Sequence, residues 1–310
     1  MPRPASDPRR VSVTRIVTPR PCETITTARR FSAASPAERS TRIVAPTRID
    51  LERAGPHGGD PLLFIHGFTG AKEDFSGWLD DFAQMGFDVA VFDLPGHGFS
   101  DPLCSRDAYD LGRLADEVLG LIDALGWSQI NVVGHSMGGM VAQIMAGEHP
   151  ERFKRAVLMS THHGPIDLDT ELAAFGATFA LTNGMVALND LLKTISLPTT
   201  TGVGADLRLD PAYDRFMNEK FERCDPAMFA GMVTSMTTCA DRLGLLCKLR
   251  IPTLVMVGEN DANFLASSHA IANTIPTATL VELRGAGHNP QFEVPDRWFD
   301  LITGFLLADV

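Results

Sequence analysis

The stretch that decides the fold is GHSMG, residues 134–138, which directly follows the apolar run INVV of residues 130–133. A helical pattern begins behind it and runs from Met140 to Glu148. A strand that turns sharply into a helix at G-x-S-x-G holds the serine in a strained conformation with its hydroxyl projecting. Glycines flank the serine because a side chain at either place would strike the neighbouring strand or helix. Ser136 is therefore the candidate nucleophile.

A serine hydroxyl is inert without a base, and the base needs an acid to orient it. His288 lies in a glycine-rich loop after the last apolar run, and Asp261 follows the run 253–257. Nucleophile, acid and base then occur in the chain order that a G-x-S-x-G architecture imposes. The sequence predicts a Ser136–His288–Asp261 triad, with Glu259 as the competing acid in the same loop.

An acyl-transfer site also needs two N–H groups aimed at the developing oxyanion. Met137 supplies one because it directly follows the nucleophile, and the loop after the strand 62–65 supplies the other, the amide of Phe68. His66 at the start of that loop is expected to brace it by hydrogen bonding and not to catalyse.

Short apolar runs alternate with helical periodicity from about residue 41 onward. Such runs, bounded by turn residues, are typical of strands buried on both faces. They occupy residues 62–65, 89–92, 130–133, 156–159, 253–257 and 279–281. Residues 109–125 carry one apolar stripe at helical spacing. The alternation predicts an α/β fold, in which helices wrap a parallel sheet.

One segment of about 90 residues, between Ser160 and Thr253, is too long for a loop. It is typical of helices at 168–181, 184–195, 211–224 and 226–243. An insertion after the carboxyl end of a strand would cover the edge of the sheet where α/β proteins bind ligands. Its phenylalanine and methionine side chains either form a small core of their own or line a pocket.

The charge balance argues against a nucleic-acid partner, because 27 basic and 38 acidic residues give a net charge of −11. Residues 1–48 nevertheless hold ten arginines and three acidic residues, so they carry +7 and the rest of the chain carries −18. This tail has too few apolar side chains to fold alone. It is either a disordered extension or misplaced start, or an organelle transit peptide. Without a run of about 18 apolar residues, no membrane-spanning helix is expected.

Five cysteines, Cys22, Cys104, Cys224, Cys239 and Cys247, form no CxxC pair and no disulfide framework. We expect them to be small buried side chains in a reducing compartment, and the protein to be cytoplasmic unless the tail directs it to an organelle. His162 and His163 have no third ligand nearby and are expected at a hinge or pocket wall. No phosphate-binding or dinucleotide fingerprint follows the first strand, so neither a cofactor nor a metal is inferred. Nothing in the sequence indicates an oligomeric state.

Five ordered motifs together resemble the α/β-hydrolase fold superfamily. They are HGF (66–68), DLPGHGFS (93–100), GHSMGG (134–139), GEND (258–261) and GH (287–288). The resemblance covers roughly residues 45–308. It implies a mostly parallel eight-stranded sheet, a helical cap and the triad assigned above, and it makes His97 part of a structural turn. One departure is that Ala262-Asn263-Phe264 follows the acid without the proline often found there.

The expected organisation is a tail at 1–40, a core at 41–161 and 249–310, and a cap at 162–248. The expected activity is that of a cofactor-independent serine hydrolase that cleaves a carboxylic ester or lactone of a medium-sized hydrophobic substrate through an acyl-enzyme. A serine nucleophile separates the chain from the epoxide hydrolases and haloalkane dehalogenases that it otherwise resembles. Alternatives are a carbon–carbon bond hydrolase, thioesterase, lyase or perhydrolase, or a small-molecule receptor that keeps the triad. An inward-pointing cap arginine would favour a substrate that bears a carboxylate.

Overall fold

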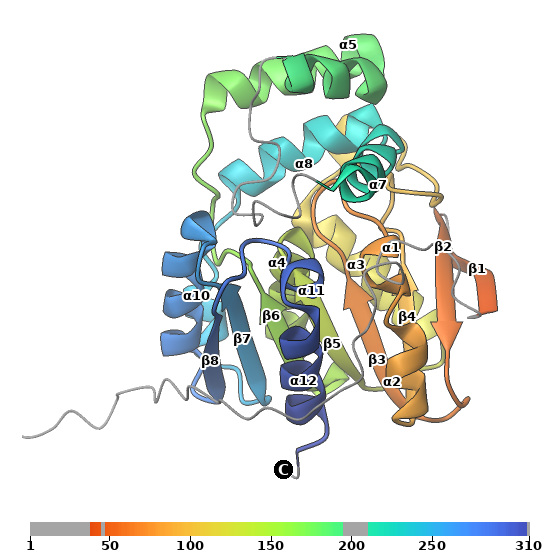
Figure 1. Cartoon of the computed structure of the whole chain (residues 1–310), viewed down its shortest axis with the longest axis vertical. Coiled ribbons are helices and arrows are strands. Elements are labelled where there is room, and N and C mark those ends of the chain that lie inside the picture. The colour runs from red at the N-terminus through yellow and green to blue at the C-terminus, as the bar shows by residue number, and fades with distance from the viewer. Residues whose placement is uncertain (1–37, 45–46, 195–209, 309–310) are drawn as a thin grey trace, which may run out of the picture.

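The central feature is an eight-stranded sheet with the strand order β1-β2-β4-β3-β5-β6-β7-β8 (Figure 1). The computed structural model describes residues 38–44, 47–194 and 210–308. The strands are β1 (Glu38–Val44), β2 (Thr47–Ala54), β3 (Asp60–Ile65), β4 (Phe87–Phe92), β5 (Ile130–His135), β6 (Phe153–Met159), β7 (Thr253–Gly258) and β8 (Ala278–Leu283). β2 pairs antiparallel with β1 and β4, and the remaining neighbours pair parallel. The predicted α/β fold with a mostly parallel eight-stranded sheet is confirmed.

The inner parallel strands are largely buried because helices cover both faces of the sheet, whereas β8 at the edge is only partly buried. Every residue of β4, β5 and β7 is buried, which explains why these strands form continuous apolar runs. All six predicted strands are present. β2 was not predicted as a strand, because its sequence (TRIDLERA) alternates with charged residues and forms no apolar run. This pattern agrees with its antiparallel position near the edge of the sheet.

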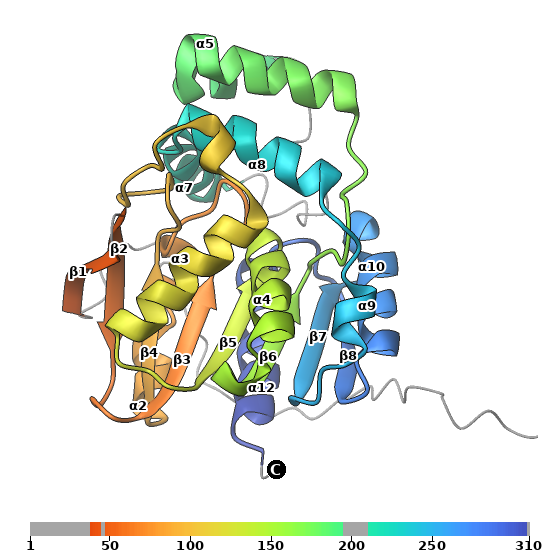
Figure 2. The same ribbon diagram turned by 180° about the vertical axis from the view of Figure 1, so that it is seen from behind.

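The covering helices form one layer on each face (Figures 1 and 2). Outside the long insertion they are α1 (Glu73–Ser76), α2 (Leu79–Gln84), α3 (Leu111–Ala124), α4 (Met137–Glu148), α10 (Ala262–Thr274), α11 (Pro290–Glu293) and α12 (Pro295–Leu306). Alternate side chains of β3 enter two separate cores. Leu63 and Ile65 join the core under α3, α4 and α10, whereas Leu62 and Phe64 join the core under α2 and α12. The predicted helix at 109–125 is α3.

The long insertion forms α5 (Thr170–Thr194), α7 (Pro211–Glu222), α8 (Pro226–Thr238) and α9 (Leu243–Leu246), which we call the inserted helices. α5, α7 and α8 lie above the carboxyl ends of the parallel strands (Figures 1 and 2). Gly184, with φ 85° and ψ 169°, breaks α5 where the sequence predicted two helices. The helix predicted at 226–243 ends early, since Cys239 is extended at φ −63° and ψ 155°.

α5 is the one described helix that is long and apolar enough to cross a membrane by length and composition alone. It spans 25 residues, and its most apolar 18-residue window has a mean hydropathy of 1.3 with 22% of that window buried. The non-helical backbone of Gly184 divides it, so that neither part reaches the about 20 residues that a straight span requires.

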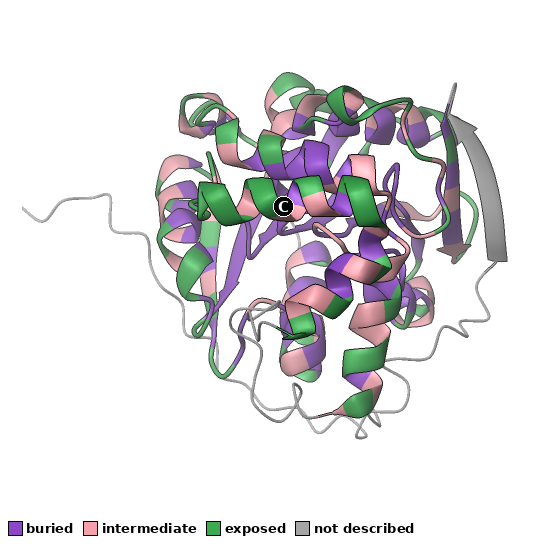
Figure 3. Ribbon diagram, turned by 90° about the horizontal axis from the view of Figure 1, so that it is seen from above, coloured by how far each residue is buried: buried purple, intermediate pink, exposed green. Residues whose placement is uncertain are grey.

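Burial follows the layers, with buried strands between helices that present exposed positions outward (Figure 3).

The cysteines do not all follow the expectation that they are small buried side chains. Cys224 is buried, but Cys104 and Cys247 are exposed and Cys239 is half-buried; all four are free thiols. Cys22 and most of the predicted tail lie outside the described residues. β1 begins at Glu38, which is inside the segment predicted as tail.

Two ion pairs fasten α7 to the loop and short helix that follow β3. Lys220 pairs with Asp74, and both side chains are nearly inaccessible. Arg223 pairs with Glu73 at 2.9 Å. The Lys220 ammonium also lies 4.2 Å from the centre of the Phe216 ring. Because a buried charge is stable only with its partner, these pairs hold α7 in one place on the core.

Asp74→Asn is expected to lower the free energy of unfolding by about 3 kcal/mol, because it leaves the Lys220 ammonium buried without a counter-charge. Denaturant unfolding measures the change. The control is Asp123→Asn, which breaks a pair with Arg152 in which the aspartate is 66% exposed. That change is expected to cost less than about 1 kcal/mol. Equal losses in the two variants would contradict the structural role of the buried pair.

Candidate active site

Ser136 lies in a strained turn between β5 and α4. Its backbone adopts φ 52° and ψ −117°, a conformation that non-glycine residues rarely take. Two residues later, a Cβ on Gly138 would lie 2.2 Å from the carbonyl oxygen of Ile65. Only glycine lets the first turn of α4 approach β3 this closely. The turn projects the Ser136 hydroxyl at the N-terminus of α4.

The structure brings the three predicted triad side chains together. His288, in the loop between β8 and α11, places Nε2 3.1 Å from Ser136 Oγ. Its Nδ1 lies 2.9 Å from Oδ2 of Asp261, which directly follows the loop after β7 and is 1% exposed. The competing acid, Glu259, is exposed, and Asp261 is the acid that contacts the histidine. This arrangement can deprotonate the serine and stabilise the resulting imidazolium.

The two predicted oxyanion donors lie on either side of the serine. Met137 is the first residue of α4, and Phe68 follows Gly67, at which a Cβ would lie 3.1 Å from the Ser136 Cβ. Within the described part of the chain, neither the Phe68 nor the Met137 amide donates to another protein group. Both N–H groups are therefore available to an oxygen at the reacting centre.

Two further histidines brace the loops around the site. His66 is fully buried; its Nε2 accepts from the Leu94 amide at 3.0 Å, and its Nδ1 donates to the Gly67 carbonyl at 2.8 Å. Burial lowers the pKa of His66, which keeps the imidazole neutral and able to do both. His97 is also buried and contacts the Pro95 carbonyl. The expectation that His66 braces its loop is confirmed.

His162 and His163 follow β6 at the start of the insertion. Their rings stack at 5.1 Å, and His163 Nδ1 lies 2.8 Å from Asp241. His162 packs edge-on against Phe264, whose ring is 4.5 Å from that of His288. His162, stacked on His163, thus packs beside Phe264, which in turn contacts the ring of His288. In the described ranges, no three histidine, cysteine or acidic side chains are grouped as metal ligands.

Two residues that contact the His288 loop, Glu293 and His135, were not found by sequence reasoning. Glu293 accepts hydrogen bonds from the amides of Gly287 and Asn289, and His135 contacts the His288 carbonyl. The one signal available was position, since Glu293 follows the candidate base by five residues and His135 adjoins the candidate nucleophile.

An apolar cavity of about 410 Å³ lies between the inserted helices and the loop after β3 that carries Phe68. Phe68 and Thr69 line it from below, and the Phe68 ring stacks on Phe229 of α8 at 5.1 Å. The other side chains that line it come from α5 and its approach, α7 and α8: Leu168, Asp169, Leu172, Ala173, Phe175, Gly176, Leu188, Asn189, Leu191, Leu192, Met217, Asn218, Phe221 and Val233. The cavity adjoins the site at Phe68 and suits an apolar group.

None of the described arginines of the insertion lines this cavity. Arg215 is exposed, and Arg223 is paired with Glu73. Arg242 is buried and donates to the carbonyl of His162 at 3.0 Å. Arg208 lies outside the described residues. No described arginine is placed to bind a substrate carboxylate in the cavity.

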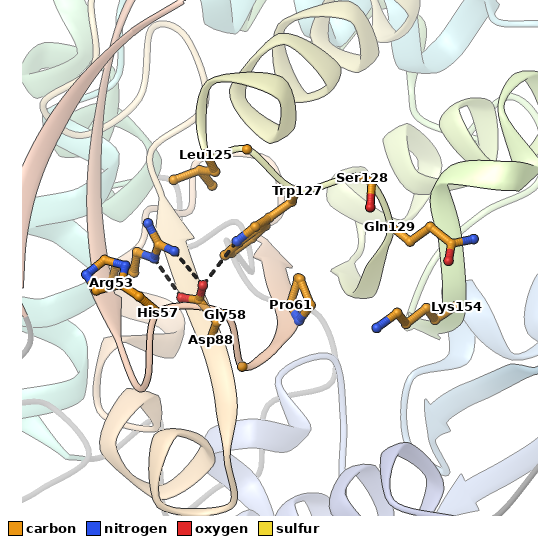
Figure 4. Close-up of a pocket in the computed structure, with 12 residues that line it drawn as sticks. Arg53, His57, Gly58, Pro61, Asp88, Leu125, Trp127, Ser128, Gln129 and Lys154 are labelled. Carbon is orange, nitrogen blue, oxygen red and sulfur yellow. Dashed lines mark hydrogen bonds and ion pairs between the residues drawn. The ribbon is translucent and has the colours of Figure 1, made fainter.

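Figure 4 shows residues that line a second cavity, of about 480 Å³, near the amino ends of β3, β4 and β5. Asp88 joins Arg53 and the Trp127 indole there, with Arg53 Nε donating at 2.6 Å and Trp127 Nε1 at 3.2 Å. Lys154 pairs with Asp60. Arg53, Asp88 and Lys154 thus each have a partner of opposite charge.

In sequence and in fold, the chain is similar to known hydrolases. A family model described as alpha/beta hydrolase fold matches residues 60–295. A 2-hydroxymuconate semialdehyde hydrolase from Pseudomonas putida is 30% identical over 267 residues, covering 85% of this chain and 92% of that protein. The enol-lactonase from Burkholderia xenovorans LB400 has a TM-score of 0.77 at 25% identity, covering 87% of this chain and 100% of its own. A thermophilic esterase from Thermogutta terrifontis has a TM-score of 0.76 at 27% identity, covering 87% and 98%.

Labelling by a fluorophosphonate, which reacts with an activated serine, tests the geometry directly. The wild-type protein is expected to be labelled on Ser136, and Ser136→Ala is expected to remain unlabelled. His288→Ala should slow the labelling by roughly 10³-fold, because the hydroxyl loses its base. Mass spectrometry of the adduct measures the rate.

Asp261→Asn should slow the same labelling reaction strongly, and Glu259→Gln should leave its rate unchanged within about two-fold. These two acids lie in one loop, so the pair of variants separates the orienting carboxylate from a general charge effect. A larger loss in Glu259→Gln would refute the choice of acid.

Proposed function

The chain belongs to the α/β-hydrolase fold family, and within it we propose a serine hydrolase that cleaves carboxylic esters or lactones of medium-sized apolar substrates. The observation that carries the proposal is the relay of Ser136 Oγ, His288 Nε2 and Asp261 Oδ2. It combines an activated nucleophile with two available amides, as acyl transfer requires.

In the first half-reaction, Ser136 Oγ attacks the carbonyl carbon while His288 Nε2 takes the hydroxyl proton. The oxyanion forms between the amides of Phe68 and Met137, and Asp261 stabilises the imidazolium. Collapse of the tetrahedral intermediate breaks the carbon–oxygen bond of the ester. The alcohol leaves with the proton from His288, and the acyl group stays on Ser136.

In the second half-reaction, His288 takes a proton from a water molecule, whose oxygen attacks the acyl carbon. The same two amides stabilise the second oxyanion. Its collapse breaks the bond to Ser136 Oγ, which recovers its proton from His288, and the carboxylic acid is released. A lactone follows the same course, with the alcohol and the acid in one product.

The apolar cavity supports the choice of substrate. Its volume of about 410 Å³ is within the range for small-molecule sites, and most of its lining side chains are apolar. The inserted helices cover the site as a cap, which disfavours long polymers. An acyl or alcohol group of medium length can occupy the cavity while its carbonyl lies beside Phe68.

A second candidate is the hydrolysis of a carbon–carbon bond next to a ketone. The 30% identity to the 2-hydroxymuconate semialdehyde hydrolase favours it. The cavity favours an ester because its described lining contains no basic side chain that could bind a substrate carboxylate. Ester turnover that Ser136→Ala abolishes supports the first candidate. Labelling of Ser136 without turnover of any ester supports the second.

Hydrolysis of p-nitrophenyl acetate, butyrate, octanoate and palmitate tests the substrate class. We expect kcat/KM to peak at butyrate or octanoate and to fall for palmitate, because the cavity holds a limited chain. Ser136→Ala should lose roughly 10³-fold or more. Equal activity in the two proteins would refute the proposed nucleophile.

Ala173→Phe and Ala174→Phe form a matched pair that tests the cavity. Ala173 lines the cavity, and its neighbour Ala174 is exposed and does not. Filling the cavity with the Ala173→Phe ring should lower kcat/KM for octanoate roughly 10-fold and leave acetate unchanged. Ala174→Phe should change neither. The same effect of both variants on octanoate would show that the acyl chain binds elsewhere.

A further inference from the structure

The loop that carries His288 has no regular structure of its own. It joins Leu283, the last residue of β8, to Pro290, the first residue of α11. Asp261 fixes only the Nδ1 side of the imidazole. Something else must therefore fix the backbone from which the ring projects, since a shift of 1 Å at a reacting group can cost roughly 100-fold in rate.

Glu293 binds the amides of the two residues that flank His288. One carboxylate oxygen, Oε1, accepts from the Asn289 amide at 2.9 Å, and the other, Oε2, accepts from the Gly287 amide. Glu293 is the last residue of α11, and Pro295 then starts α12. The carboxylate is thus tied to two helices and reaches back over the loop.

The carboxylate is held in a half-buried position near two other titratable groups, His288 and Asp261. Burial raises the pKa of Glu293, and the two amide hydrogen bonds act in the opposite direction because they stabilise the charged form. Both carboxylate oxygens accept hydrogen bonds from the loop that carries the base.

His135 binds a third main-chain group of this segment, the carbonyl of His288. Its Nε2 lies 2.8 Å from the His288 carbonyl oxygen, and since that oxygen can only accept, Nε2 carries the proton. Burial lowers the pKa of His135 to about 3, so the ring stays neutral and keeps this tautomer. His135 ends β5 and directly precedes Ser136. One strand thus positions both the nucleophile and the carbonyl of the base.

We propose that Glu293 and His135 are positioning residues of the active site. They hold the main chain around His288 through three hydrogen bonds, a clamp that sets the distance between His288 Nε2 and the Ser136 hydroxyl. The proposal rests on the proposed function in that His288 is the base. It gives both residues a role in kcat and none in substrate binding, because neither lines the apolar cavity.

Glu293→Gln tests the first half of the clamp. The glutamine side chain has the same size, but its NH2 group replaces one of the two accepting oxygens. One main-chain N–H then faces a donor and loses its hydrogen bond. We expect kcat per titrated active site to fall roughly 10- to 100-fold, with KM within about two-fold of wild type. The control is Glu282→Gln, whose exposed carboxylate pairs with His269 on the surface. It should leave both constants unchanged.

A pair of variants tests the second half. Gln has an N–H donor at the same number of bonds from Cβ as Nε2 of histidine, so His135→Gln should keep most of kcat. His135→Leu lacks a donor and should lose roughly as much as Glu293→Gln. Active-site titration corrects each rate for unfolded protein, so a purely structural defect would lower the number of sites and not kcat per site.

The rate of fluorophosphonate labelling of Ser136 gives a second readout that requires no substrate. It should fall in Glu293→Gln and His135→Leu in proportion to kcat. Wild-type labelling rates in both variants would overturn the proposal, whatever esters the protein hydrolyses. Loss of the proposed function is a separate result, seen as equal ester turnover by the wild type and Ser136→Ala.

Discussion

The site depends on the contact between the first turn of α4 and the end of β3. A Cβ at Gly138 would lie 2.2 Å from the Ile65 carbonyl oxygen, so the approach exists only because that position has no side chain. The approach forces Ser136 to φ 52°. Such strain costs of order 1–3 kcal/mol and persists because the surrounding packing over-determines it. The fully buried β5 and the buried first two turns of α4 supply that packing, and the amides of Phe68 and Met137, the candidate oxyanion donors, adjoin the contact.

The parts of the fold that sequence could predict are those in which burial leaves a pattern. Strands covered on both faces must be largely apolar, as β5 and β7 are. Ser136 directly follows β5, Asp261 lies three residues after β7, and His288 lies five residues after β8, so their positions could be inferred together. β2 gave no such pattern because it lies near the edge of the sheet and alternates with charged residues. α8 was predicted too long because helical periodicity continues past Thr238 although Cys239 is already extended. The exposed cysteines show that residue type alone does not determine burial.

The contacts that hold His288 left almost no trace in the sequence for a different reason. Glu293 and His135 bind main-chain groups, and every residue has the same amide and carbonyl. No residue type at the other end of the bond therefore marks the contact. Likewise, the lining of the apolar cavity depends on how α5, α7 and α8 pack on one another. Their apolar residues were equally suited to an independent core, and the break at Gly184 sets which of them meet.

The ion pairs of α7 give the inserted helices unequal anchorage. α7 is bound to the core through Lys220 and Arg223, whereas α5 packs chiefly on α8 and α7 and keeps Phe175 and Val186 exposed. The position of α7 thus depends on charge pairs with the core, and that of α5 on packing against its neighbouring helices. Heating sharpens this difference, because the cost of desolvating charged pairs falls with temperature while apolar contacts gain little. With the ion pairs of the described inserted helices confined to α7, the insertion relies on helix packing to position α5.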